Sequence, residues 1–148
     1  MPTAARLVAA VLLGGLAWYV SELIEDIPAM IEDPPVKRFS EINAVLGALC
    51  GWFVLGSRSP DRYAASFSHG LTAVIATIFW VLLIHSGNEM IDRALKKLYD
   101  TPMQAVVAVF QISVEDGAKM ASFDVIVTLF VGGLVAGIIA TFIGRRYP

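Results

Sequence analysis

The sequence is poor in charged residues and in cysteine, and each shortage excludes a class of protein. Charged residues make up 16% of the 148 positions and hydrophobic residues 57%, whereas soluble domains have about 25% and about 45–50%. The only cysteine, Cys50, cannot form an internal disulfide or a cysteine-rich zinc site. A net charge of −2 gives no basic surface for nucleic acid. The composition favours a single membrane domain, in which long segments face lipid instead of water.

What the sequence has instead is a set of long runs without Asp, Glu, Lys or Arg. These uncharged runs lie at residues 7–21, 42–57, 63–88 and 125–144. A helix that crosses a membrane needs about 20 mainly apolar residues. We expect the first run to be an uncleaved helix and not a signal peptide, because Trp18 and Tyr19 stand where the small residues of a cleavage site would follow. We predict four membrane spans, at residues 4–24, 39–57, 66–87 and 123–143.

Two connecting segments differ from the spans. Residues 25–41 form an acidic stretch with three prolines, which oppose a long helix. No glycine lies between Glu25 and Asp33, although a calcium loop needs a turn glycine, so we expect a solvated loop. Residues 88–114 carry apolar residues at helical spacing, interrupted at Pro102. The part after Pro102, about residues 103–114, is too short to span and too apolar for a free loop, so we expect it to lie at the membrane interface or to pack on the bundle.

The fold class that follows is all-α: an integral membrane four-helix bundle with an amphipathic interfacial segment between the third and fourth spans. Four spans place both termini on one side of the membrane. The terminus side would carry Arg6, Arg58, Arg62, Arg145 and Arg146, and the other side Lys37, Arg38, Arg93, Lys96, Lys97 and Lys119. The terminus-side positives lie in very short segments, where the positive-inside rule works best. We therefore expect cytoplasmic termini.

The fourth predicted span carries a stripe of small residues. Gly133 and Gly137 form a G-x-x-x-G motif, which lets another helix approach closely. The stripe as a whole comprises Gly132, Gly133, Ala136, Gly137 and Ala140. It suits packing within the bundle, contact with another membrane subunit, or contact with a second copy of the chain. Small residues around Cys50 similarly favour close packing of the second span.

Ionisable residues give only weak site candidates. His85 and Glu89 are four residues apart on one helix face, and two such ligands could hold a proton or a weakly bound metal. We favour the simpler interpretation, an interfacial histidine hydrogen-bonded to its neighbour, because metal sites usually need three or four ligands. Nothing near Cys50 in the sequence stabilises a thiolate, so we expect it to pack and not to react.

Motifs of enzymes and carriers are missing from the sequence. It contains no phosphate-binding loop, H-E-x-x-H motif, nucleophile elbow or haem-attachment motif. No charged residue lies centrally in any predicted span, whereas ion carriers usually have one. We therefore predict no catalytic, cofactor-binding or metal-binding residues and a protein that is not an enzyme.

Six short stretches form a pattern over essentially the whole chain. They are Met1–Val11, Leu16–Ser21, Arg38–Ala44, Gly47–Trp52, Tyr99–Pro102 and Val131–Gly137. Together they resemble the TrgA family, small membrane proteins associated with tellurite resistance in alphaproteobacteria. The resemblance implies an inner-membrane location and a link to tellurite tolerance, and it implies no catalytic residue. An alternative is an accessory subunit of a larger transporter, respiratory or photosynthetic assembly. A tellurite-reducing membrane enzyme is a weaker third hypothesis, because no cofactor motif is present.

Overall fold

The computed structural model describes residues 4–28, 38–58 and 63–146, and this part of the chain is helical. The acidic segment 29–37, with most of the predicted loop, lies outside the described residues. The helices are α1 (Ala4–Glu25), α3 (Phe39–Cys50), the π-helix η1 (Gly51–Leu55), α4 (Gly56–Arg58), α5 (Tyr63–Leu95), α6 (Pro102–Met120) and α7 (Phe123–Arg146).

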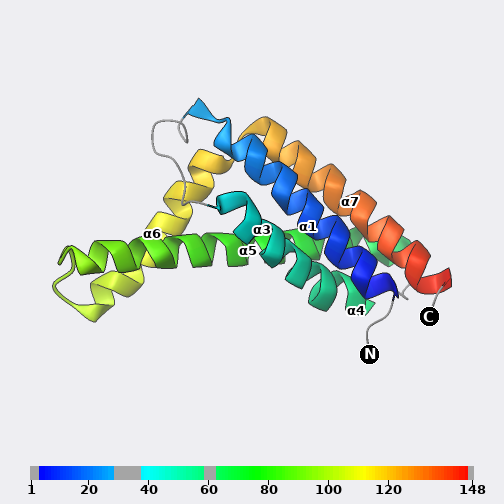
Figure 1. The fold of residues 1–148 in the computed structure, drawn as a ribbon, viewed down its shortest axis with the longest axis horizontal. Helices are drawn as coiled ribbons and strands as arrows, with labels where there is room; N and C mark the ends of the chain where they lie inside the picture. Colours follow the sequence, from blue (N-terminus) through cyan, green and yellow to red (C-terminus); the bar gives the residue numbers. More distant parts are fainter. Residues whose placement is uncertain (1–3, 29–37, 59–62, 147–148) are drawn as a thin grey trace.

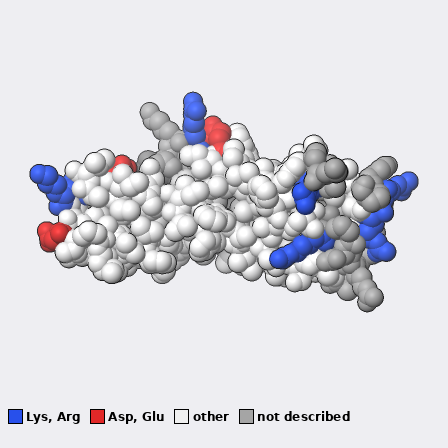
Figure 2. All heavy atoms as spheres, turned by 90° about the horizontal axis from the view of Figure 1, so that it is seen from below, with Lys and Arg blue, Asp and Glu red and all other residues white. Residues whose placement is uncertain are grey.

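Four of these helical segments are long and apolar enough to cross a membrane. They are Ala4–Glu25, Phe39–Arg58, Ala65–Leu95 and Phe123–Arg146. In Figure 2 the charged side chains lie at the two ends and along the upper edge of the face shown, and the rest of that face is almost free of them. The prediction of an all-α bundle with four spans is confirmed, and the chain is a multi-pass membrane protein.

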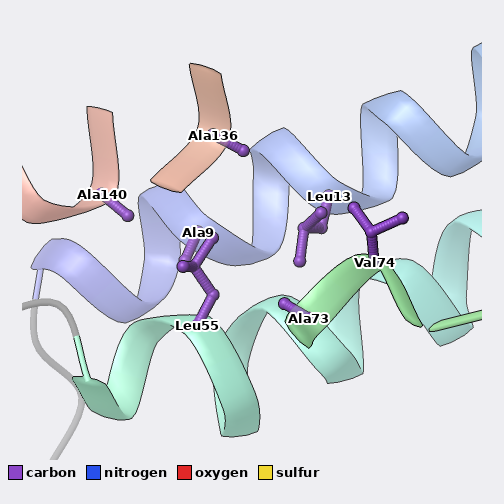
Figure 3. Packing of buried hydrophobic residues seen from close by; sticks show 7 residues of the cluster. All are labelled: Ala9, Leu13, Leu55, Ala73, Val74, Ala136 and Ala140. Carbon is purple, nitrogen blue, oxygen red and sulfur yellow. The ribbon is translucent and has the colours of Figure 1, made fainter. Parts of the chain in front are cut away.

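The spans meet around a core of small side chains. Helix α1 packs against α3 and α7, and α5 packs against α7. The start of α1 and the end of α7 lie at the same end of the molecule (Figure 1). At the centre, Ala9 and Leu13 of α1 contact residues of η1, α5 and α7 (Figure 3). Alanines dominate this cluster, so the helix backbones come close together.

The third span is longer than predicted. We expected it to end at Gly87 and a separate amphipathic helix to follow, but α5 continues to Leu95. A glycine inside a helix costs only about 1 kcal/mol, and Ser86 beside it is anchored by a hydrogen bond to Ser113 of α6. The helix ends at Leu95, and Lys97, two residues later, adopts a left-handed conformation with a φ of 56°. The Lys97 and Leu98 amides then bond back to Ala94 and Arg93, the pattern of a Schellman cap.

The predicted amphipathic segment 88–114 is therefore divided between two helices. Residues 88–95 belong to α5, and α6 begins at Pro102 and runs six residues beyond Val114, to Met120. Thr101 caps α6 through its side chain, and proline at the first helical position suits a helix start. Helix α6 packs back on α5, which agrees with one of the two positions expected for it.

The second span contains a π-helical turn at Gly51–Leu55 that the sequence did not predict. A Cβ atom on Gly51 would lie 2.3 Å from the carbonyl oxygen of Ala9, and one on Gly47 would lie 2.5 Å from that of Leu13. The second span thus follows α1 at very short distance over two turns. This agrees with the close packing predicted for the small residues around Cys50, which is itself buried.

Candidate functional site

The small-residue stripe of α7 lies against helices of the same chain. A Cβ atom on Gly137 would lie 2.3 Å from the carbonyl oxygen of Ser66, and one on Gly70 would lie 2.1 Å from that of Gly133. Gly132 faces a different neighbour, because its Cβ would lie 2.4 Å from the side chain of Leu16 on α1. The two glycines of the motif therefore contact α5, and Gly132 contacts α1.

The two alanines of the stripe complete the same surface. Ala136 and Ala140 are buried in the core cluster with residues of α1 and α5 (Figure 3). Beside them, the hydroxyl of Ser66 donates a hydrogen bond of 2.8 Å to Thr141. All five residues predicted as a packing or partner face are thus in contact with, or next to, the chain's own helices.

A chain of polar side chains joins three spans near the end of the bundle opposite the termini. The hydroxyl of Ser21 on α1 donates to the Ala17 carbonyl at 2.7 Å and accepts from Asn43 Nδ2 of α3 at 2.8 Å. The amide oxygen of Asn43 lies 2.8 Å from His85 Nε2 of α5. An amide oxygen only accepts, so Nε2 of His85 carries the hydrogen. The arrangement satisfies both polar atoms of an asparagine side chain that is only 3% exposed.

The predicted pairing of His85 with Glu89 is wrong. His85 bonds Asn43 and lies against the ring of Phe39, at a centroid distance of 4.8 Å. Glu89 forms an ion pair with Arg93, one turn further along α5. Two physical preferences explain the difference: a buried amide needs a partner, and a carboxylate gains more from a cation than from a neutral imidazole.

The fold also bears on the hypothesis that His85 and Glu89 bind a metal ion. Within residues 4–28, 38–58 and 63–146, no group of three or more His, Cys, Asp or Glu side chains is placed to hold a metal ion. The residues that sequence reasoning missed are Ser21 and Asn43. The signal that could have found Asn43 was its position, since it is the only strongly polar side chain in the uncharged run 42–57.

Charged side chains gather where α6 packs on the end of α5. Lys119 lies 3.1 Å from Glu115 and 4.0 Å from Asp116. The pKa of Asp116 is raised above its ordinary value, mainly because the carboxyl group is partly buried and also because Glu89 repels its charge, while Lys119 opposes the shift. This carboxyl group therefore holds its proton to a higher pH than a solvated aspartate.

The opposite side of α6 is an exposed apolar face. Met103, Val107, Phe110 and Val114 recur at helical spacing and are all exposed, whereas Ala108 and Ile112 are buried against the rest of the chain. We call these four exposed residues the α6 apolar face. A helix that buries one side and exposes a second apolar side suits contact with the lipid interface or with another protein.

The polar side chains described above thus bond helices to one another. The comparisons with known proteins add no function, because no family model, no curated protein and no solved structure matches this chain.

Proposed function

We propose that this chain is a non-enzymatic, multi-pass protein of a bacterial inner membrane, of the TrgA type, and that it contributes to tolerance of tellurite. The observation that carries the proposal is the pattern of residues that resembles that family. Its stretches Leu16–Ser21, Arg38–Ala44, Gly47–Trp52 and Val131–Gly137 supply many of the closest helix contacts and two members of the polar chain, Ser21 and Asn43. Because the residues that carry the resemblance hold helices together, the resemblance supports a structural role in the membrane and not a catalytic one.

The absence of an enzymatic role is part of this proposal, and the positions of the polar side chains support it. Ser21, Asn43 and His85 are bonded to one another, and Ser66 to Thr141. Cys50 is buried against the neighbouring spans, where a thiol is a small packing group and has poor access to a dissolved oxyanion.

Deletion and complementation in the source bacterium test the proposal. Loss of the chain should lower the tellurite concentration that stops growth, and wild type and Cys50→Ala should restore it equally at matched abundance. Unchanged tolerance after deletion would remove the link to tellurite. A loss confined to Cys50→Ala would instead favour thiol chemistry. Purified protein with NADH and tellurite should form no more elemental tellurium than a protein-free blank.

An accessory-subunit role is the second candidate, and the α6 apolar face favours it. The small-residue stripe of α7 is occupied within the chain, so this face of α6 is the better docking surface. Phe110→Glu should remove co-purifying chains if a partner covers the face. Gln111→Glu is the matched control, because it adds the same charge at the next, already polar, exposed position. If both variants keep the same co-purifying chains, no partner depends on this face.

A further inference from the structure

A cavity of about 180 Å³ lies between α1, α5, α6 and α7. Its wall is mostly apolar and includes Val20 and Ile24 of α1, Leu82 of α5, and Val125 and Leu129 of α7. An engineered cavity of about 150 Å³ with such a lining stays dry and binds benzene. The space is therefore large enough for a segment of several carbon atoms.

The few polar side chains on the wall have their hydrogen bonds elsewhere. Ser21 bonds the Ala17 carbonyl and Asn43, and Asn43 bonds His85 through its other amide atom. Thr77 donates to the Ala73 carbonyl of its own helix. A buried water molecule needs two to four polar partners, whereas the polar side chains of this wall are few and already bond within the protein. The cavity favours an apolar occupant over water.

The cavity opens toward the lipid-facing surface between α5 and α7. Two wall residues are large, apolar and exposed: Ile78 of α5, at 37%, and Ile126 of α7, at 55%. The closest contacts of these two helices involve Gly70, Gly133 and Gly137. Away from that crossing, α5 and α7 diverge and α6 lies across the gap (Figure 1). Both exposed residues belong to candidate spans, so the opening faces hydrocarbon.

The positions of the wall residues along α1 and α7 show in which half of the bundle the cavity lies. It contacts the last two turns of α1 and the first two turns of α7. Both positions lie in the half of the bundle opposite the termini (Figure 1). The hydrocarbon next to the opening therefore belongs to the membrane leaflet on that side.

We propose that this cavity is a lipid-binding site, which takes the end of an acyl chain from the leaflet opposite the termini. The chain enters between Ile78 and Ile126, and its terminal carbons contact Val20, Ile24 and Val125. The site is independent of any role in tellurite tolerance, because it follows from the shape and chemistry of the cavity alone.

Photolabelling from the bilayer tests the site. The protein is reconstituted in phosphatidylcholine vesicles that contain a small fraction of phosphatidylcholine with a diazirine at the end of one acyl chain. After irradiation, labelled positions are located by mass spectrometry. Val20, Ile24 and Val125 should be labelled, although they are only 5%, 8% and 4% exposed. Labelling confined to outward residues such as Val131 and Val135, which are exposed on α7, would overturn the proposal.

A matched pair of variants separates entry into the cavity from general lipid contact. Ala121→Leu adds bulk to the cavity wall, and Ala118→Leu adds the same bulk on the exposed surface of α6. Ala121→Leu should abolish labelling of Val20 and Val125, and Ala118→Leu should leave it at the wild-type level. Equal labelling in both variants would overturn the proposal. If Ala121→Leu lowers the melting temperature, Gly117→Leu takes its place as the cavity-filling variant, because a Cβ atom at Gly117 would contact only Leu82, at 3.5 Å. The same loss of labelling is then expected of Gly117→Leu.

Discussion

Glycine residues in the spans fall into two groups according to what an added methyl group would meet. A Cβ on Gly137 would lie 2.3 Å from a backbone oxygen of α5, whereas one on Gly15 would meet nothing within 4 Å. Backbone atoms cannot turn aside as a side-chain end can, so a methyl group at Gly137 must push two helices apart. At Gly133 the nearest atom is a methyl carbon of the Val74 side chain, at 2.7 Å, and the nearest backbone atom is 3.5 Å away.

Alanine substitutions at these positions should therefore have opposite effects. We expect Gly137→Ala to destabilise the bundle by about 1–3 kcal/mol, in the range of overpacked cores, and Gly133→Ala to cost less. Gly15→Ala should stabilise it by about 0.4–1 kcal/mol through the loss of freedom in the unfolded chain. Thermal unfolding of the detergent-solubilised variants measures all three. Equal melting temperatures for Gly137→Ala and Gly15→Ala would contradict the close contact between α5 and α7.

The hydrogen bond between His85 and Asn43 should contribute a modest amount to stability. Interhelical hydrogen bonds in membranes average about 0.6 kcal/mol, with values up to about 1.7. We expect a double-mutant cycle of His85→Ala and Asn43→Ala to give a coupling free energy in that range. His85→Ala with Glu89→Ala serves as the control cycle and should show coupling close to zero. A larger coupling in the control cycle would restore the pairing expected from the sequence.

At the scale of helices, the contact of α6 with α5 should depend on pH through Asp116. In the folded protein the pKa of this group is raised above its ordinary value of 3.8. Burial is the main cause and repulsion by Glu89 the second, while the charges of Lys119 and Arg93 oppose the shift. At pH values between the unfolded-state pKa and the folded-state pKa of Asp116, the folded state therefore binds more protons than the unfolded state. Stability should fall as the pH rises from about 4 through the folded-state pKa, and remain low above it.

Thermal unfolding over a series of pH values measures this dependence. Asp116→Asn should flatten the fall in melting temperature, because the neutral amide has no charge to bury. Asp92→Asn is the control, since Asp92 is an exposed acid on the adjoining end of α5, and it should keep the wild-type profile. If the melting temperature of the wild type relative to that of Asp116→Asn rises with pH, the sign assigned to Asp116 is wrong.

The sequence predicts a structural feature when residues close to it in the chain determine that feature. The four spans follow from uncharged runs, and the start of α6 follows from Pro102, so both could be read from neighbouring residues. The bond between Asn43 and His85 joins positions 42 residues apart. The π-helical turn lies where Gly51 meets Ala9. Both features depend on which helices become neighbours, and that information is not local.

At one end of the whole molecule, the charged side chains that the structure describes are arginines. Arg6, Arg58, Arg145 and Arg146 belong to the first turn of α1, the end of the second span and the last turn of α7. These elements contact one another at the end where both termini lie. The opposite end carries both signs of charge, with Arg93, Lys119 and four acids on α5 and α6. Because short arginine-rich segments tend to be retained in the cytoplasm, we predict cytoplasmic termini, which reporters can test.

A reporter that is active only in the cytoplasm should be active when fused after Pro148. A reporter that is active only in the periplasm should be active when inserted at Thr101, between α5 and α6, where the chain turns at the far end of the molecule. Exchanging the two reporters is the control, and both should then be inactive. The reverse pattern would invert the orientation and place the arginine-rich end outside. If the two positions report the same compartment, α7 is not the single span that separates Thr101 from the C-terminus, and the four-span bundle itself would have to be revised. The result bears on the lipid site as well, because cytoplasmic termini would place the cavity in the periplasmic leaflet. Photoreactive phosphatidylcholine supplied to that leaflet alone should then suffice to label Val20 and Val125.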